Sequence, residues 1–539
     1  MTRARRVRWL GRVRYQDALA LQHALFAGTD DYLLLLEHPH VYTLGVRAKL
    51  EHVLVPPADV GAELVKTDRG GDVTYHGPGQ LVGYPITSVA MGPDAIPDYV
   101  HRVEQLVIES LADVGLPSAS RLDGYPGVWV EGRKICAIGV RVSRGRTMHG
   151  FALNVDPDLS MFGHIVPCGI ADKPVTSLAA EGVSVTMREV VDAVAARWAE
   201  WNAVAVERQD VAWHVAPSDM SAFTRSGGTS VRLLGRLAQA GVDHQTLLAV
   251  DERKPEWLRV KANMGPEYRS LKKTMRSLDL VTVCEEAGCP NIFECWAEGT
   301  ATFMINGERC TRACGFCLVD TRKPAPPDPD EPAHVAEAVD RMGLAHAVVT
   351  AVARDDLADG GASEFAAVIK AIRRRRPTTQ VEVLISDCKG APDALGLIFD
   401  ARPDVLAHNV ETVPRLQRAV RPSASYARSL AVLARAHAAG LTTKSSVIVG
   451  MGETFDEVVG ALADLRAVGV DIVTLGQYLR PTSSHLPVAR WWTPQEFEDV
   501  AAIGMAMGFA HVQASPLTRS SYHAKQAATA AAAHSEAVS

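Results

Sequence analysis

The stretch ATFMINGERCTRACGFC, residues 301–317, joins a short apolar run to three closely spaced cysteines. The run ATFMI has the length and apolar character of a buried strand. It is followed by Cys310, Cys314 and Cys317, which have C-x3-C-x2-C spacing. In β/α barrels the loops that follow the strands carry the chemistry. The sequence therefore predicts a reactive cysteine loop at the end of the first strand of an α/β domain.

Six more apolar runs continue this pattern toward the C-terminus, with segments of helical period between them, for example at 363–375, 427–439, 455–468 and 494–507. Strands that alternate with helices are typical of a parallel sheet, either open or closed as a full or partial barrel. We predict such a domain over residues 251–525, followed by a disordered Ala-rich tail at 526–539. The six runs are HAVVTAV, VEVLIS, DVLAHNV, SSVIVG, DIVTLGQYL and HVQAS.

Residues 1–205 lack this repeating unit. Residues 127–155 alternate apolar and polar side chains, with turns at Glu131-Gly132 and Ser143-Arg144-Gly145, which predicts an antiparallel meander. Together with the helices this predicts an α+β domain. The Ser/Gly/Pro-containing segment 206–250 is predicted to be a linker or an extended lead-in. The predicted helices span 17–27, 97–114 and 187–201, and DYLLLLEH is a predicted buried strand.

The composition narrows the class of protein. A chain of 539 residues suggests about two to four domains. The net charge of −6 gives no indication of nucleic-acid binding. No apolar run approaches the ~18 residues of a membrane span, so we expect a cytoplasmic protein without a membrane partner. Thiols stay reduced in that compartment, so clustered cysteines indicate metal binding or catalysis rather than disulfides.

Six of the nine cysteines fall between residues 284 and 317. The upstream triplet, Cys284, Cys289 and Cys295, has C-x4-C-x5-C spacing. Zinc sites usually pair their ligands as C-x2-C, which only Cys314 and Cys317 match. Iron–sulfur clusters take up to four thiolates, and three cysteines leave one iron open to another ligand. Iron–sulfur centres are therefore favoured, while a structural zinc module and ordinary core cysteines remain alternatives.

These motifs resemble a known family. The C-x3-C-x2-C loop resembles the radical S-adenosylmethionine superfamily, and CEEAGCPNIFEC before it is similar to lipoyl synthases. The resemblance implies a C-terminal partial (β/α) barrel of radical-SAM type. It extends over roughly 250–525 and includes RDDLADGGASEF (354–365), HNVETVPRLQRAVRP (408–422), LGQYLRPTSSHLPV (475–488) and RSSYHA (519–524).

The resemblance also implies the chemistry of this half. Cys310, Cys314 and Cys317 would hold a [4Fe-4S] cluster that binds S-adenosyl-L-methionine. Reduction would cleave the S-adenosyl-L-methionine to a 5′-deoxyadenosyl radical. The radical would abstract hydrogens from C6 and C8 of a protein-bound octanoyl chain. A second [4Fe-4S] cluster would donate two sulfurs, and a ferredoxin or flavodoxin would supply electrons. The ligands of the second cluster would be Cys284, Cys289, Cys295 and Ser521.

The expected contacts to S-adenosylmethionine or the substrate are Gly360, Gly361, Asn409 and Glu411, together with the segment 450–453. Glycine lets backbone amides approach a ligand closely. Ordinary β-to-α turns explain the glycines equally well.

The segments RGGDVTYHGPGQ, GRKICAIGVRV, HGFALNV and PCGI in the N-terminal half resemble the lipoyl-pathway octanoyltransferases, which are similar in fold to lipoate and biotin protein ligases. The resemblance assigns a dyad to Cys168 and Lys134. Cys168 would carry the acyl group and Lys134 would act as acid and base. By themselves, Cys168 fits a buried small hydrophobe and Lys134 an exposed strand lysine. The expected lining of the acyl tunnel is Arg69, Gly70, Gly71, Asp72, Val73, Thr74, Tyr75, His76, Ala137, Ile138, Gly139, Gly150, Phe151 and Ala152.

The combined expectation is a bifunctional lipoate biosynthesis enzyme. It would transfer octanoyl from acyl-carrier protein to a lipoyl-domain lysine and then insert two sulfurs into that chain. The expected acceptors are the lipoyl domains of 2-oxoacid dehydrogenases and the glycine cleavage H protein. In the alternatives, the N-terminal half is a non-catalytic docking module for lipoyl domains, or the cysteines form the zinc module.

Overall fold

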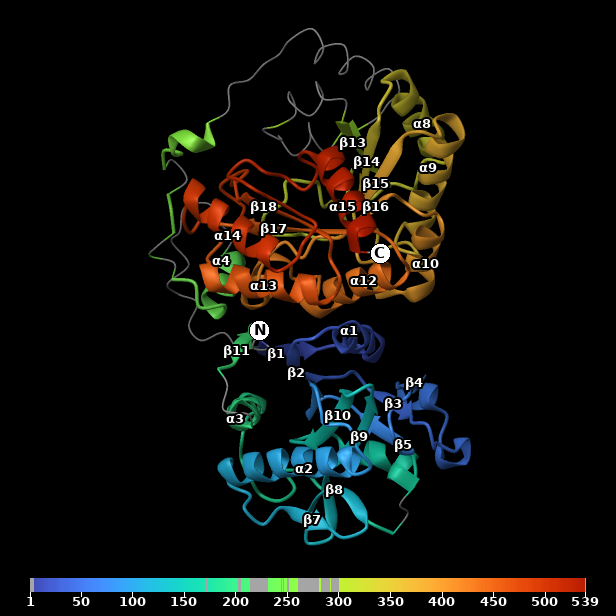
Figure 1. The fold of residues 1–539 in the computed structure, drawn as a ribbon, viewed down its shortest axis with the longest axis vertical. Helices are drawn as coiled ribbons and strands as arrows, with labels where there is room; N and C mark the ends of the chain where they lie inside the picture. The colour runs from blue at the N-terminus through green and yellow to red at the C-terminus, as the bar shows by residue number, and fades with distance from the viewer. Residues whose placement is uncertain are drawn as a thin grey trace. The chain divides into compact units, whose positions relative to one another are not determined.

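The computed structural model describes residues 4–169, 172–201, 205–213, 231–243, 245, 247–249, 252–259, 281–282, 291 and 300–538. The chain divides into two compact units, residues 1–213 and 214–539 (Figure 1). Within the described part of the chain, no helix is both long and apolar enough to cross a membrane.

The first unit contains a mixed eight-stranded sheet, as the α+β prediction requires. Its strand order is β11-β1-β2-β6-β10-β9-β8-β7, and β1 pairs in parallel with both β11 and β2. The predicted meander at 127–155 is β8, β9 and β10, which pair antiparallel. The strands are β1 (Arg5–Arg12), β2 (Asp31–Glu37), β6 (Gln80–Ile86), β7 (Ser120–Leu122), β8 (Tyr125–Val130), β9 (Arg133–Ser143), β10 (Arg146–Asn154) and β11 (Glu207–Asp210).

Helices cover both faces of this sheet. The main core lies between the sheet and α2 and α3, and it includes Trp198 and Cys136. A capping box between Thr186 and Glu189 begins α3, since each side chain accepts the other's backbone N–H. Helix α1 contacts β6 and β10. The helices are α1 (Tyr15–Ala27), α2 (Ala95–Asp113) and α3 (Met187–Glu200).

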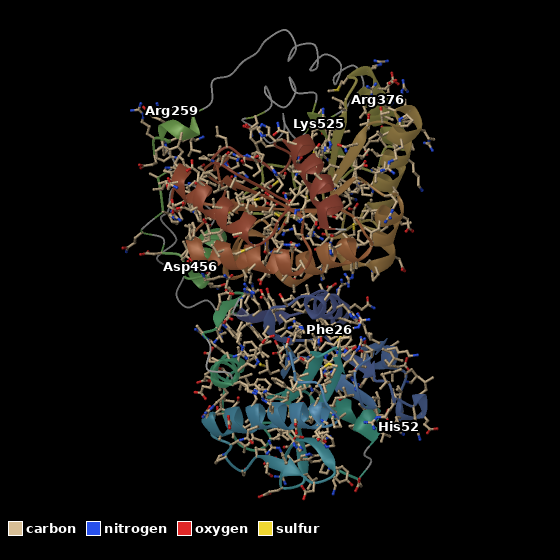
Figure 2. All side chains as sticks on the ribbon, in the orientation of Figure 1. Phe26, His52, Arg259, Arg376, Asp456 and Lys525 are labelled. Atoms are coloured by element: carbon tan, nitrogen blue, oxygen red, sulfur yellow. The ribbon has the colours of Figure 1, made fainter. Side chains whose placement is uncertain are left out.

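A three-stranded sheet of order β4-β3-β5 forms a small lobe of the first unit, with its own core around Tyr42 and Tyr75. The lobe also holds His52, which is labelled in Figure 2. Its elements are β3 (Val41–Leu44), β4 (Glu63–Lys66), β5 (Val73–His76) and the 3-10 turns η1 (Leu50–His52), η2 (Pro57–Val60), η3 (Leu159–His164) and η4 (Pro167–Gly169).

The first unit ends later than the predicted boundary at residue 205. Strand β11 pairs with β1, and the Trp213 ring stacks on Trp9 with centroids 4.4 Å apart and planes 8° apart. Residues 206–213 therefore belong to the first unit and not to a linker. Later in the expected linker, α4 (Val231–Gln239) packs against α11 (Gln417–Val420) of the second unit.

The second unit is a parallel α/β sheet. Strands β13 to β19 are parallel and follow one another in chain order, with β12 added antiparallel to β13. Among the described strands β13 and β19 do not pair, so the sheet is an open, partial barrel. All seven predicted strands are present. The strands are β12 (Val281–Thr282), β13 (Thr300–Ile305), β14 (His346–Ala351), β15 (Gln380–Leu384), β16 (Val405–Ala407), β17 (Thr443–Val449), β18 (Ile472–Gln477) and β19 (His511–Ala514).

Helices line the outer side of this curved sheet (Figure 1). Side chains of β13 to β16 pack there against the helices that connect the strands. The remaining elements are α8 (Glu331–Arg341), α9 (Ala362–Arg375), α10 (Pro392–Asp400), α12 (Tyr426–Ala438), α13 (Phe455–Ala467), α14 (Pro494–Ala506) and the 3-10 turns η7 (Glu256–Leu258), η8 (Cys388–Gly390) and η9 (Pro414–Leu416).

The prediction of a disordered tail at 526–539 was wrong. The segment forms helix α15 (Ala524–Val538), which begins beside Lys525 in Figure 2. Alanine is the strongest helix former, and its small side chain lets the helix approach the sheet closely. Ala527, Ala528 and Ala531 are buried against Val405 and Ile472, which begin β16 and β18.

Candidate functional site

The first unit encloses a cavity of about 130 Å³ between β9, β10 and the small lobe. Lys134 and twelve of the fourteen predicted tunnel residues line it. The lining residues are Tyr15, Arg47, Arg69, Gly70, Gly71, Asp72, Thr74, His76, Tyr84, Pro126, Lys134, Ala137, Ile138, Gly139, His149, Gly150, Phe151 and Ala152.

The two predicted residues that do not line the cavity are Val73 and Tyr75. Side chains alternate between the faces of a strand. On β5, Thr74 and His76 face the cavity, while Val73 and Tyr75 enter the core of the small lobe. A motif read as a continuous run cannot separate these two sets.

Lys134 is buried, with 8% of the residue exposed, and it lines the cavity from β9. Its backbone N–H donates to the Pro174 carbonyl at 2.9 Å, which holds this part of β9. The Nζ atom lies 4.6 Å from the Trp129 ring centroid, a cation–π distance. Cys136, two residues on, is fully buried in the main core, and burial raises the pKa of its thiol. The two neighbours therefore have different surroundings.

Cys168 belongs to the 3-10 turn η4, and its side chain lies outside the described residues. The turn contacts β5 and is fastened to the small lobe, because the Val166 N–H donates to the His52 carbonyl at 2.8 Å. A Cβ on Gly169 would lie 2.8 Å from Asp72 Oδ2, so Asp72 packs directly against this turn. Asp72 in turn lies 2.6 Å from His52 Nδ1.

Several polar side chains line part of the cavity. The Arg69 guanidinium donates to Thr43 Oγ1 and to the Thr43 carbonyl. Burial lowers the pKa of His76 well below its usual range. Burial also lowers the pKa of His149, although Asp68 at 2.7 Å opposes that shift. Burial therefore disfavours the charged form of both imidazoles, and the ring nitrogens can take part in hydrogen bonds.

Five lining residues were not predicted as site residues: Tyr15, Arg47, Tyr84, Pro126 and His149. His149 stands beside Gly150 in the quoted segment HGFALNV, so motif extension could have found it. The other four come from α1, the loop after β3, β6 and β8. No local signal in the sequence links those elements to the cavity.

In the second unit the predicted cysteine loop follows β13. The Cys310 N–H donates to the Asp320 carbonyl at 2.8 Å, and the Gly315 N–H donates to the Val420 carbonyl at 2.9 Å. Burial raises the pKa of the Cys317 thiol to about 12, and the neighbouring Cys314 and Cys310 add to this. The loop thus brings three half-buried free cysteines together, and cysteine thiolates are the usual ligands of an iron–sulfur cluster.

Arg312 fastens this loop. Its guanidinium makes a two-pronged ion pair with Asp355, through Nε and Nη2 at 2.7 Å each. Nη2 also lies 2.5 Å from Asp387 Oδ1. Burial on its own would raise the pKa of Asp387, but Arg312 outweighs it and lowers the value to about 2. The loops after β13, β14 and β15 are thereby joined by one side chain.

Asn409 and Glu411 lie close to the cysteine loop. Asn409 Nδ2 donates to Glu411 Oε1 at 3.1 Å. Burial raises the pKa values of Cys314 and Cys317, and the nearby Glu411 carboxylate adds to both shifts. The two glycines pack on protein instead: a Cβ on Gly361 would lie 2.5 Å from Asn306 Nδ2, and one on Gly360 would lie 3.1 Å from Cys388 Cα. Both have positive φ, as tight turns require.

Cys284, Cys289 and Cys295 lie outside the described residues. Ser521 is described and half-buried, just before α15. One contact links the two regions: Asn291 Nδ2 donates to the Leu517 carbonyl at 2.7 Å. Asn291 lies between Cys289 and Cys295, so part of the upstream triplet's segment meets the chain that leads to Ser521.

Comparisons with known proteins match different families to the first and the second unit of the chain. The lipoyl protein ligase A/B catalytic domain matches residues 14–199. The N-terminal domain of lipoyl synthase matches 238–289, and the radical SAM superfamily matches 304–465.

Among relatives, the chain is 57% identical to a lipoyl synthase of Mycobacterium avium over 285 residues, which is 52% of this chain and 93% of that protein. It is 58% identical to a lipoyl synthase of Rubrobacter xylanophilus over 51% of this chain and 86% of that protein. A solved bipartite lipoate protein ligase from Thermoplasma acidophilum shares 19% identity over 39% of this chain and 88% of its own, with a TM-score of 0.35. A likeness that low says nothing about substrate.

Proposed function

Because the chain belongs, through its C-terminal half, to the lipoyl synthase family of radical SAM enzymes, we propose that it builds the lipoyl cofactor in two consecutive steps. The family places it in lipoate biosynthesis, with a ligase/transferase-type domain ahead of a radical SAM sulfurtransferase domain. The first step transfers octanoyl from acyl-carrier protein to a lipoyl-domain lysine. The second inserts two sulfurs into that octanoyl chain.

The observation that carries the proposal is the presence of both sites in one chain. A buried lysine lines a cavity in the first unit, and a cysteine loop follows β13 in the second. Neither feature belongs to an ordinary packed core, where lysine and clustered thiols are rare unless they are paired or have a function.

In the first step, the Cys168 sulfur attacks the acyl carbon of the carrier thioester and the carrier thiol leaves. Lys134 takes the Cys168 proton and returns it to the leaving sulfur. Lys134 then accepts a proton from the acceptor lysine, whose amine attacks the Cys168 thioester to form the amide. The bond between the acyl carbon and the Cys168 sulfur breaks, and Lys134 returns the proton to the departing sulfur, which restores the free thiol. The apolar lining from Ala137, Ile138, Phe151 and Ala152 supports a bound acyl chain. No ATP is consumed in this scheme.

In the second step, Cys310, Cys314 and Cys317 would hold the cluster that binds S-adenosylmethionine, and Cys284, Cys289, Cys295 and Ser521 would hold the second. When bound, these groups supply hydrogen-abstracting radical chemistry at C6 and C8 and the sulfur atoms. Asn409, Glu411 and the loops bearing Gly360 and Gly361 would position S-adenosylmethionine and the substrate. The contact of Asn291 with Leu517 supports Ser521 as a ligand beside the upstream triplet. A ferredoxin or flavodoxin would supply the electrons.

Metal analysis tests the second step directly. Iron, sulfide and zinc are measured per chain after anaerobic reconstitution. About eight irons and eight sulfides are expected, which corresponds to two four-iron clusters. About four would mean that one triplet does not bind a cluster. Stoichiometric zinc with little iron would contradict the sulfur-insertion step and favour a structural zinc module.

The acyl-transfer step is tested with Cys168→Ala and Lys134→Met. Both variants are expected to lose octanoyl transfer to a lipoyl domain, and Lys134→Met should also fail to form the acyl-enzyme detected by intact-mass spectrometry. Cys136→Ala is the matched cysteine control, because Cys136 is buried in the core. Unchanged transfer by Cys168→Ala would favour the docking-module alternative.

A further inference from the structure

Arg312 stands between two of the cysteines in the loop after β13, yet 8% or less of its surface is open to solvent. A charged side chain is buried at this level only when it is paired, because leaving water is costly for an ion. Its two partners, Asp355 and Asp387, lie in the loops after β14 and β15. Arginine suits this place because its planar fork can bind two carboxylates at once.

The ion pairs of Arg312 with Asp355 and Asp387, here called the clamp, lie close to the Cys310 sulfur. Two backbone N–H groups point at this atom: that of Arg312, with N to Sγ 3.4 Å, and that of Ala353, at 3.3 Å. Ala353 belongs to the loop after β14, two residues before Asp355. The Thr311 N–H and hydroxyl both donate to the Ala353 carbonyl at 2.9 Å, and these bonds hold the loop after β13 beside the loop after β14.

Amide hydrogen bonds to cysteine sulfur stabilise the more negative, reduced state of an iron–sulfur centre and so raise its reduction potential. The bond from Ala353 depends on the loops after β13 and β14 staying together, and the bond from Arg312 depends on the conformation of the loop after β13 itself. The side chain that crosses between them and continues to the third loop is that of Arg312.

We propose that Arg312 is a positioning residue that sets the reduction potential of the cluster on Cys310, Cys314 and Cys317, by holding two amide donors against the Cys310 sulfur. This inference rests on the proposed function, because it requires a cluster at these cysteines. It assigns Arg312 no contact with the substrate; the residue acts through Cys310.

The test compares Arg312→Gln with Asp355→Ala in the full chain, with Cys284, Cys289 and Cys295 replaced by alanine so that one cluster remains. Midpoint potentials are measured by redox titration monitored by electron paramagnetic resonance. Both variants are expected to shift the potential to more negative values, because each opens the clamp and weakens the N–H···S bonds. Arg415→Gln is the control: Arg415 makes a similar two-pronged pair with Glu457 on another part of the barrel, and its loss should leave the potential unchanged.

The two variants separate positioning from simple charge. If Arg312 acted through its charge alone, Arg312→Gln would lower the potential and Asp355→Ala, which removes a negative charge, would raise it. Opposite shifts, or no shift in either variant, would overturn the inference. If Arg312→Gln takes up no iron, Asp355→Ala decides, since the Asp355 side chain is one-third exposed and its removal is milder. A parent protein without a cluster would instead contradict the proposed function.

Discussion

Glu364 lies in the first turn of α9 and is half-buried among other acids. Burial raises the pKa of its carboxyl to about 7, and the charges of Glu331, Asp328 and Asp359 add to the effect. Its Oε1 atom is buried without a hydrogen-bond partner in the described part of the chain. The carboxyl is therefore partly protonated at neutral pH, unlike an ordinary glutamate.

This predicts a pH-dependent effect of Glu364→Gln. A carboxyl whose pKa is raised on folding favours the folded state below its unfolded pKa and loses that contribution as pH rises toward 7. The variant should thus be more stable than the parent at pH 8, by about 1 kcal/mol after allowance for solvent screening, and equal to it near pH 4. Thermal melts at the two pH values measure this.

The control for this comparison is Glu308→Gln, because Glu308 is an exposed glutamate of the same unit. Glu308→Gln should change stability little, because a substitution at an exposed position away from packed features has a small effect. If Glu364→Gln were destabilised equally at pH 4 and pH 8, the Glu364 side chain would be needed for packing, and burial of its charge would not reduce the stability of the folded state.

Helix α15 is the element that departs most from expectation. Because one of its faces is buried, we expect a larger side chain to lower the stability of the protein at a buried position and not at an exposed one. Ala527 is 1% exposed against the sheet, whereas Ala532 faces solvent. Ala527→Leu should cost about 1–3 kcal/mol of stability, since a packed site has no room for the extra carbons. Ala532→Leu is the matched control and should be neutral in chemical denaturation. Equal effects at both positions would show that the helix does not pack as described.

The regular elements follow from the sequence because one periodicity governs each of them. All seven strands of the barrel were predictable, since each is a short apolar run and segments of helical period separate them. Helix α15 was not, because an Ala-rich segment has no apolar stripe to signal burial. The small lobe was missed for another reason: β3, β4 and β5 are four residues long, too short to show a period.

The site was predictable where its residues share a motif and not where distant elements meet. Lys134 and six of the eight residues from Arg69 to His76 line the cavity, and they were predictable because they stand together in quoted segments. Tyr15 and Tyr84 reach the same cavity from α1 and β6, which only the folded sheet brings together. Arg312 belonged to the opening motif, but its role depends on the carboxylates of Asp355 and Asp387, which lie 43 and 75 residues further along the chain.

At the scale of the whole molecule, each unit contains its own candidate site, and the chain joins them covalently. Tethering raises the effective concentration of the second site for a lipoyl domain just released from the first. We expect the fusion to lipoylate a lipoyl domain faster than an equimolar mixture of its separated halves at low enzyme concentration. The advantage should vanish as enzyme concentration rises. Lipoylated product is measured by mass spectrometry.

The matched control keeps both units intact. Cys168→Ala and Cys310→Ala full-length variants are mixed, so that each molecule keeps one active half and the pathway must run between molecules. This mixture should match the separated halves. A fusion no faster than either mixture would show that covalent union brings no kinetic advantage.

The stacked indoles of Trp9 and Trp213 join the last residue of the first unit to its first strand. The two rings lie in nearly parallel planes, so this aromatic contact adds to the pairing of β11 with β1. A separated first half that ended at residue 205 would lack both β11 and this contact. It would leave the Trp9 ring and one edge of β1 uncovered, so a stable separate half needs the residues through 213.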